Sequence, residues 1–345
     1  MVTRRPTTAR KESAPSAPAW FAEPWPWDAA PAGPPLTWWD EVVLASSGGK
    51  DSHVMNLWLS EQPGFDPDRT HVVHNDTGQE HDGALDKAQE AAAHVGIPSE
   101  RILTTAPYLG QTLLDLVLRR GRWPGMSPTT RPCTNTLKRD PTDKLLRRLG
   151  NDARILILTG ERREESPNRA KMDAWAFRRA CAPTLNRLVM HWRPMLDWST
   201  EQVFDGIARH GQRPLWVYDA GLVRSQAGPD GGAPLPAFSR ASCAFCVYLR
   251  PRELEVSFSL YPALACLATK VEVYIGHRWR QDLALIDVWA RIYGPGGHRA
   301  AEGRRLLALG PERLIEEATG RRVDEVELTL VDDLLAAACV RLPCI

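Results

Sequence analysis

The hydrophobic pattern of the middle of the chain alternates between short apolar runs and longer stretches with apolar residues at helical spacing. Runs typical of strands come at four places: 41–45, 70–74, 101–104 and 154–160. Helical spacing predicts helices between these runs, at 51–60, 82–95, 111–120 and 143–149. Strands that alternate with helices predict an α/β fold with a doubly wound parallel sheet, in which a ligand binds at the carboxyl ends of the strands.

The two ends of the chain have patterns that differ from the middle. Residues 1–36 are rich in Pro, Ala, Ser and Thr, which predicts a disordered tail, although Trp20, Trp25 and Trp27 could dock on the body or on a partner. Beyond Trp198 the pattern is mainly helical, with a Gly- and Pro-rich loop up to about 238 and predicted helices at 200–210, 251–275, 280–293, 311–318 and 325–340. The expected organisation is a tail (1–36), a sheet domain (37–240) and a helical C-terminal region (241–345).

Charge and composition narrow the class of protein. The chain has 345 residues, with 43 Lys and Arg against 42 Asp and Glu, so any nucleic-acid surface must be a local patch. No apolar run approaches the roughly 20 residues that span a bilayer, and the N-terminus lacks the apolar core of a signal peptide, so we expect a cytoplasmic protein without membrane partners. In that setting the seven cysteines predict free thiols or metal ligands rather than disulfides.

The strongest chemical signal is the sequence Ser46-Ser47-Gly48-Gly49-Lys50-Asp51-Ser52, which joins the first predicted strand to the first predicted helix. Its two glycines let the backbone approach a phosphate closely, and the amides and dipole of the helix start favour negative charge. Lys50 adds a positive charge, and Ser47 and Ser52 add hydroxyl donors. The spacing is too tight for a Walker loop. The alternative is a glycine-rich turn that only joins the strand to the helix.

Polar residues also follow two other predicted strands. Asp76 comes after the second strand, where it could hold a metal ion, contact a nucleotide or be an ordinary turn residue. Gly160 ends the strand at 154–160, and Arg162, Arg163 and Arg169 come after it. Guanidinium groups suit phosphate or sulfate oxygens. The alternative for these arginines is a solvated charge run paired with the glutamates among them.

These motifs resemble the PP-loop ATP pyrophosphatases, and the later segments resemble the phosphoadenylyl-sulfate (PAPS) reductase-like branch of that superfamily. Five segments besides the loop carry the resemblance in the family's order, namely 75–78, 133–138, 159–169, 193–198 and 242–246. The resemblance implies an adenine nucleotide alpha hydrolase-like fold and a site for ATP and Mg²⁺. It implies catalytic roles for Lys50, Asp51 and Asp76. The implied nucleotide contacts are Ser46, Ser47, Gly48, Gly49, Lys50, Asp51, Ser52, Asp76, Gly160, Arg162, Arg163 and Arg169.

The cysteines pose a separate question. Cys243-x-x-Cys246 has a metal or redox spacing, and Cys133 falls in a segment where the resemblance implies cysteine. Three such thiolates can hold an iron–sulfur cluster. The family's second upstream cysteine is absent here, so one iron would stay open or a fourth ligand would come from Cys266 or Cys181. Zinc ligation and free thiols are the alternatives.

The complete phosphate loop favours cleavage of ATP to pyrophosphate with an adenylated acceptor. PAPS reductases instead bind a nucleotide with no β,γ-pyrophosphate to release, and they usually end in a cysteine-bearing tail that differs from the end of this chain. The motif combination resembles the sulfur-transfer ATPases of bacterial DNA phosphorothioation, which implies a cysteine desulfurase as sulfur donor and DNA and other phosphorothioation proteins as partners.

The sequence is also compatible with a nucleic-acid-binding surface and with other functions. A basic stretch at 119–123, followed by Arg131, could meet a nucleic-acid backbone or be a solvated helix end. The alternative functions are PAPS reduction, tRNA thiolation and a non-catalytic nucleotide-sensing module.

Overall fold

The computed structural model describes residues 35–105, 112–178, 181, 187–227, 237–241, 243–320 and 331–342. Most of the predicted tail, with its three tryptophans, lies outside these residues, as do Cys344 and the start of the helix predicted at 325–340. Leu36 is described and is buried in the 3-10 helix Leu36–Trp38. The folded body therefore includes the last residue of the predicted tail.

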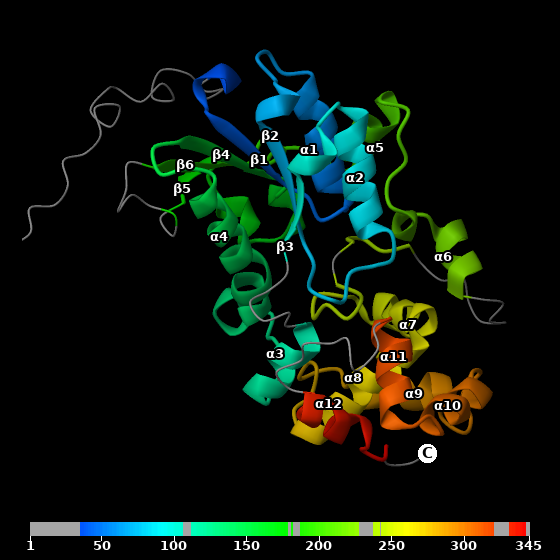
Figure 1. The fold of residues 1–345 in the computed structure, drawn as a ribbon. Coiled ribbons are helices and arrows are strands. Elements are labelled where there is room, and N and C mark those ends of the chain that lie inside the picture. Colours follow the sequence, from blue (N-terminus) through cyan, green and yellow to red (C-terminus); the bar gives the residue numbers. More distant parts are fainter. Residues whose placement is uncertain are drawn as a thin grey trace, which may run out of the picture.

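Six strands form one sheet in the order β3-β2-β1-β4-β6-β5 (Figure 1). Their bounds are β1 Glu41–Ala45, β2 Thr70–Asn75, β3 Ile102–Thr105, β4 Arg154–Thr159, β5 Trp175–Phe177 and β6 Leu188–Trp192. All neighbouring strands pair in parallel except β5, which pairs antiparallel with β6 at the edge. The predicted α/β fold with a doubly wound, mainly parallel sheet is confirmed, and four of the strands lie where the apolar runs predict them.

The two strands at one side of the sheet are not predicted from the sequence. β5 is three residues long, and only the first three residues of β6 are buried. β6 ends with the half-buried His191 and Trp192. Apolar signals of this length do not stand out from the surrounding polar residues.

Alternate residues of the strands face two different helix layers. Val42 and Leu44 of β1 join an apolar cluster with α1, α2 and α5, whereas Val43 faces the other side and clusters with Leu146 of α4. Figure 1 shows these layers on opposite sides of the sheet. Burial on both faces explains why the central strands are continuous apolar runs. The helices of the two layers are α1 Lys50–Ser60, α2 Ala84–His94, α4 Asp140–Arg148 and α5 Thr200–Arg209.

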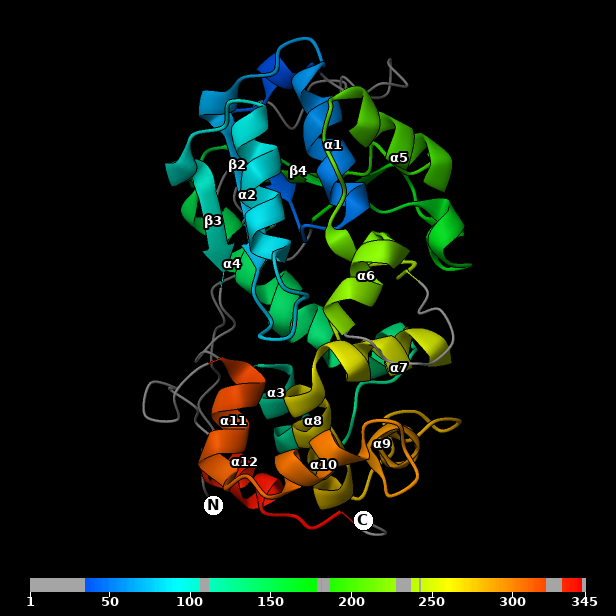
Figure 2. The same ribbon diagram turned by 90° about the vertical axis from the view of Figure 1, so that its right-hand side faces the viewer.

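A second apolar cluster lies below the sheet domain and is formed mainly by helices (Figure 2). These helices are α3 Leu113–Arg120, α6 Ala220–Ala227, α7 Pro251–Leu260, α8 Pro262–Ile275, α9 Leu285–Tyr293, α10 Ala300–Leu307, α11 Pro311–Thr319 and α12 Val331–Ala338. The almost fully buried α8 contacts α3, α7, α9, α10, α11 and α12. Since α3 precedes residue 240 in the chain, the packing does not divide at the predicted domain boundary.

The helical region departs from the sequence-based expectation in two further ways. Pro262 separates α7 from α8 within the predicted segment 251–275, because proline cannot continue the preceding helix. α6 and α10 are not predicted, because α6 lies inside the stretch that reads as a Gly- and Pro-rich loop and α10 carries a glycine, which weakens a helical signal. Among the described residues, no single helix is long and apolar enough to cross a membrane, although the bent pair of α7 and α8 meets the same criteria of length and composition.

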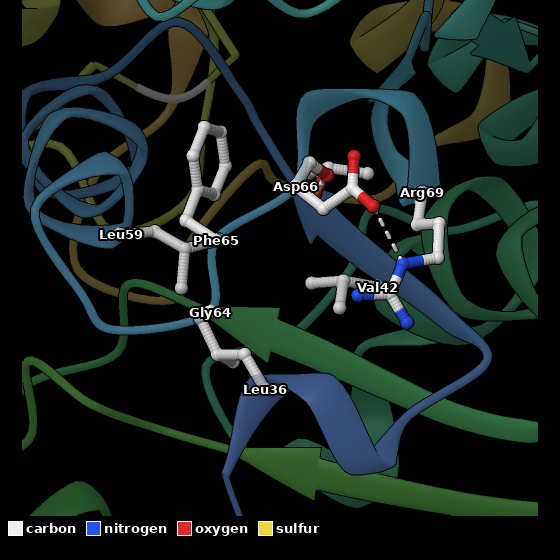
Figure 3. Close-up of a pocket in the computed structure, with 8 residues that line it drawn as sticks. Leu36, Val42, Leu59, Gly64, Phe65, Asp66 and Arg69 are labelled. Carbon is white, nitrogen blue, oxygen red and sulfur yellow. Dashed lines mark hydrogen bonds and ion pairs between the residues drawn. The ribbon is translucent and has the colours of Figure 1, made fainter.

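A small pocket lies at the amino ends of β1 and β2 (Figure 3). It is lined by Leu36, Val42, Leu59, Gly64, Phe65, Asp66, Arg69 and Thr70. In Figure 3 the carboxylate of Asp66 accepts a hydrogen bond from Nε of Arg69 at 2.8 Å. Ligands of open α/β sheets bind at the carboxyl ends of the strands, so this pocket lies at the wrong end to be the candidate site.

Glu272 of α8 gives a test of the helical core. Its buried carboxylate accepts hydrogen bonds from three amides: Trp279 at 2.6 Å, Leu285 at 3.0 Å and Ile286 at 2.9 Å. Glu272→Ala leaves these amides without an acceptor, so we expect it to lower the free energy of unfolding by about 3 kcal/mol or more in urea denaturation. Glu255→Ala is the matched control. It removes exposed ion pairs to Arg252 and Arg291 and is expected to cost under about 1 kcal/mol. Equal losses in the two variants would contradict this role.

Candidate functional site

The two central strands of the sheet are β1 and β4, and the chain continues from them to opposite sides of the sheet. β1 leads through the loop 46–49 into α1 and then to β2 on one side, whereas β4, its other neighbour, pairs with β6 on the opposite side. Such a switch point leaves a crevice outside the carboxyl ends of the strands, where ligands of α/β folds bind. The phosphate loop 46–52 and Gly160 are therefore brought together as the sequence predicts.

Two glycines allow backbone segments to approach closely at this point. Gly48 has a φ of 71°, and a Cβ there would lie 2.0 Å from the carbonyl oxygen of Ala84 at the start of α2. A Cβ on Gly160 would lie 2.6 Å from the carbonyl carbon of Asp51. Any side chain at these positions would push the loop away from α2, or the end of β4 away from α1.

The polar groups of the loop fit an oxyanion. Oγ of Ser52 accepts from the amide of Ser47 at 3.2 Å and donates to the carbonyl oxygen of Gly49 at 3.0 Å, which fixes the turn. Oγ of Ser46 is buried and has no hydrogen-bond partner among the described residues. A buried hydroxyl without a partner costs about 1–3 kcal/mol. An oxyanion at the start of α1 would use this hydroxyl together with the first amides of the helix.

Lys50 is buried at the first position of α1. Its Nζ donates to Asp51 at 3.1 Å and to the carbonyl oxygen of Ser239 at 3.2 Å. The same atom lies 5.0 Å from the ring centre of Tyr218. Burial lowers the pKa of Lys50, and the charge of Asp51 counteracts this effect. The ammonium group is therefore in contact with the carboxylate of Asp51, the carbonyl of Ser239 and the ring of Tyr218.

Tyr218 joins the phosphate loop to the segment that precedes Cys243. Its hydroxyl accepts from the amide of Lys50 at 3.3 Å and from the amide of Ala241 at 2.8 Å. Burial raises the pKa of Tyr218, so the hydroxyl keeps its proton at neutral pH. Sequence reasoning missed this residue, because a lone tyrosine in the predicted loop before 238 carries no motif.

Arg162 is buried and orients Asp51. Its Nε donates to the carboxylate of Asp51 at 2.6 Å, and its other nitrogens donate to Glu164, to the carbonyl oxygen of Trp198 and to the hydroxyl of Thr200. The donors of this guanidinium are thus bonded to protein groups. The predicted contact of Arg162 with a nucleotide stays a prediction.

Arg163 makes its hydrogen bonds within and beside the loop that follows β4, and its predicted contact with a nucleotide stays a prediction. Its guanidinium donates to Asp197 at 2.7 Å and to the carbonyl oxygens of Ala170 and Met172 at 2.7 Å each. These contacts hold the loop after β4 together, and they direct the side chain into that loop rather than onto the phosphate loop. The sequence pattern cannot separate adjacent arginines that point in different directions.

Arg169 lies in an ion-pair network beside the crevice. It pairs with Glu165 and, at 3.9 Å, with Glu161, which also accepts from Arg193 at 2.7 Å. Burial would raise the pKa of Glu161, but the two arginines hold it below its usual value. The charge of Asp51 also acts on Arg169, which places this guanidinium near the start of α1.

Asp76 follows β2 at the same edge of the sheet. Its amide donates to the carbonyl oxygen of Thr105, and its carboxylate accepts from the amide of Gly78 at 2.8 Å. The side chain thus fixes the turn after β2, in agreement with the turn alternative. The hard oxygens of a carboxylate also suit Mg²⁺, so the metal role stays a prediction.

Three cysteines share a neighbourhood around Lys138. Cys133 precedes the π-helix Thr134–Arg139, which carries this lysine, and Cys243 pairs with Glu80 in an isolated β-bridge. The charges of Cys243, Glu80, Cys246 and Cys133 raise the pKa of Lys138. Burial raises the pKa of the Cys243 thiol to about 12, although Lys138 opposes this effect. The cysteines predicted at 133, 243 and 246 are thus brought together.

The two candidates for a fourth ligand lie in other parts of the fold, and their role as ligands stays a prediction. Cys266 is buried in α8 within the helical core, and Cys181 lies 3.3 Å from the carboxylate of Asp143 on the α4 side of the sheet. In the part of the chain that the structure describes, no three His, Cys, Asp or Glu side chains are placed to hold a metal ion.

A pair of arginines extends the positive charge of the site. The guanidinium carbons of Arg131 and Arg240 lie 4.9 Å and 5.6 Å from the ring centre of Tyr248. Neither has a carboxylate partner among the described residues, and Nε of Arg131 is buried without a hydrogen bond. Arg240 acts electrostatically on Lys50. Trp123 of the predicted basic stretch is buried in the helical core, so it is not exposed for stacking on a base.

Comparison with solved structures gives a distant likeness. The phosphoadenylyl-sulfate (PAPS) reductase from Candida auris, solved as a phosphate complex, matches with a TM-score of 0.39 and 13% identity. The match covers 56% of this chain and 89% of that chain. This TM-score is too low to carry an argument about function.

Comparisons of sequence give the family. The "Uncharacterized 37.8 kDa protein in gpa 5′region" of Escherichia phage 186 is 29% identical over 199 residues, which is 56% of this chain and 48% of that protein. The chain thus spans about half the length of the curated relative it matches. The model of the phosphoadenosine phosphosulfate reductase domain matches residues 41–267, which is more than half of the chain. The chain therefore belongs to the phosphoadenosine phosphosulfate reductase domain family.

Proposed function

We propose that this enzyme binds ATP at the loop 46–52, cleaves it to AMP and pyrophosphate, and uses the adenylated acceptor for sulfur transfer. The observation that carries the proposal is the complete loop with the buried Lys50 at the switch point of the sheet. A 5′-triphosphate supplies β- and γ-phosphates for this lysine and for the start of α1. PAPS has no such pyrophosphate group, so the loop suits ATP better.

In the proposed first step, an oxygen of the acceptor attacks the α-phosphorus of ATP. The bond from the α-phosphorus to the bridging oxygen of the β-phosphate breaks, and pyrophosphate leaves. Lys50 and the dipole of α1 stabilise the charge that develops on pyrophosphate, while Asp51 orients the ammonium group. Asp76 is the carboxylate that we assign to Mg²⁺, a cation that neutralises part of the charge of the phosphates.

In the proposed second step, Cys243 carries the sulfur and a neighbouring thiol resolves the product. A cysteine desulfurase supplies a sulfur atom as a persulfide on Cys243. Its terminal sulfur attacks the adenylated acceptor, and AMP leaves. Cys246 or Cys133 then attacks the sulfur of Cys243, which frees the thiolated acceptor and leaves a disulfide for an external thiol to reduce. No proposed step uses an iron–sulfur cluster.

The acceptor that best fits the positive charges of Arg131 and Arg240 is a phosphodiester of DNA, as in phosphorothioation. Arg131 and Arg240 support this choice, because stacking on the ring of Tyr248 orients a guanidinium without neutralising its charge. One nitrogen of Arg240 donates to the carbonyl oxygen of Glu165 at 3.3 Å, and this neutral acceptor leaves the charge in place. Arg240 acts on Lys50 and on Arg169, and Arg131 acts on Arg169 and on the thiol of Cys133. The pair therefore lies between the nucleotide loop and the thiols, where an acceptor phosphate must sit.

Lys50→Ala tests the cleavage step. We expect wild type to release AMP and pyrophosphate from ATP when DNA and persulfide-loaded cysteine desulfurase are present. Loss of the ammonium group is expected to lower this rate by about 100-fold or more. Lys87→Ala on α2 is the matched control, because that lysine pairs with Glu90 at the surface. Pyrophosphate release is measured by an enzyme-coupled assay, and AMP by chromatography.

Parallel reactions separate this function from its alternatives. Replacing DNA with tRNA, or ATP with PAPS and a thiol reductant, gives three distinct readouts: phosphorothioate linkages, thionucleosides and sulfite. Sulfite from PAPS with no AMP from ATP would overturn the proposal in favour of PAPS reduction. ATP binding without turnover under every condition would favour the nucleotide-sensing module.

Arg131→Gln and Arg240→Gln test the acceptor site. Each loses a charged donor, so we expect the affinity for a short DNA oligonucleotide to fall roughly 10-fold per variant, by fluorescence anisotropy. The slope of log affinity against log salt concentration should become shallower by about 0.7 per arginine for a single strand. Arg252→Gln, whose exposed side chain pairs with Glu255, should bind DNA like wild type. Unchanged affinity in the double variant would rule out this acceptor site.

A further inference from the structure

The thiol assigned to sulfur transfer is enclosed in this structure. Cys243 is 9% exposed, and its Sγ lies 3.5 Å from the hydroxyl of Thr77. The next residue donates its amide to the carbonyl oxygen of Gln79 at 2.7 Å. A reagent or an acceptor cannot reach the enclosed sulfur, so this arrangement is a resting state.

The segment just before Cys243 is attached to the phosphate loop by three hydrogen bonds. Nζ of Lys50 donates to the carbonyl oxygen of Ser239 at 3.2 Å. The hydroxyl of Tyr218 bridges two amides, accepting from Lys50 at 3.3 Å and from Ala241 at 2.8 Å. All three contacts use donors or acceptors at the start of α1 or beside it. The protein thus occupies with its own backbone part of the place where phosphate oxygens are expected.

We propose that Tyr218 is a positioning residue through which nucleotide binding at the loop 46–52 releases the segment 239–241 and exposes Cys243. This inference rests on the proposed function, because it makes ATP the ligand that triggers the release. It assigns the order of events: the thiol becomes reactive after the nucleotide is in place, so the persulfide is not spent on water or small thiols beforehand.

The release follows from a competition for the same donors. A phosphate oxygen carries negative charge. The ammonium group of Lys50 therefore donates a stronger hydrogen bond to this oxygen than to the neutral carbonyl of Ser239. The amide of Lys50 likewise turns from the hydroxyl of Tyr218 to the phosphate. That hydroxyl has no acceptor for its own proton among the described residues, so it can donate to the same phosphate. A shift of the tyrosine toward the phosphate lengthens the hydrogen bond from the amide of Ala241, so the segment loses the contact that held it against the loop.

Thiol labelling measures the release directly. The full-length enzyme is treated with iodoacetamide with and without a saturating ATP analogue that has a methylene group between the α- and β-phosphates. The rate at each cysteine is read by peptide mass spectrometry. We expect the analogue to speed labelling of Cys243 about fivefold, which corresponds to about 1 kcal/mol for one broken hydrogen bond. Cys339 is exposed and serves as the internal reference.

Tyr218→Phe tests whether Tyr218 acts through the hydrogen bonds of its hydroxyl or only through the packing of its ring. The variant keeps the ring under Lys50 but removes the bridge, so Cys243 should be labelled faster without nucleotide, and the analogue should add little. Tyr293→Phe is the matched control, since it removes a buried hydroxyl bonded to the carbonyl oxygen of Phe258 in the helical core.

The outcomes are distinguishable from those of the proposed function. Analogue binding is measured by calorimetry in the same preparation. If the analogue binds and labelling of Cys243 stays the same or slows, the inference is wrong while ATP binding stands. If the analogue does not bind, both proposals fail. Should Tyr218→Phe not fold, the wild-type comparison with and without the analogue still decides the question.

Discussion

The ammonium group of Lys50 is buried at the start of α1, where the helix dipole is also positive, so like charges meet at a point that water hardly reaches. Asp51 offsets part of this charge, but its carboxylate is shared with Arg162. The remaining excess suits an anion with several oxygens. The closely packed Gly48 and Gly160 and the hydroxyl of Ser46, which has no partner among the described residues, fit this same requirement.

The helical region completes the site rather than standing apart from it. α3 and the π-helix Thr134–Arg139 carry the chain from the sheet domain into the helical core and back, which brings Cys133 and Lys138 beside the segment of Cys243 and Cys246. Lys138 opposes the effect of burial on the Cys243 thiol. The phosphate loop and the segment that precedes Cys243 therefore lie at the same edge of the sheet, and Tyr218 accepts hydrogen bonds from both.

The sequence predicts those parts of the structure that require a recognisable pattern of neighbouring residues. Four strands buried on both faces are continuous apolar runs, and the phosphate loop has residues that only a tight strand-to-helix turn requires. Tyr218, Arg240 and Tyr248 have no such signature, because their roles depend on which distant segments the fold brings together. The same reason accounts for Cys266, whose place in the helical core cannot be read from its spacing to Cys246. Adjacent arginines such as Arg162 and Arg163 diverge because one enters the crevice and the other turns into its own loop.

The most direct test of this account is a crystal structure of the enzyme with the α,β-methylene analogue of ATP and Mg²⁺. The account predicts the β- and γ-phosphates on the amides and side chains of the loop 46–52, Lys50 withdrawn from the carbonyl of Ser239, and the α-phosphorus facing the side of the crevice that holds Cys243. A nucleotide bound elsewhere, or an α-phosphorus that faces away from the thiols, would contradict the claim that ATP cleavage and sulfur transfer share this site.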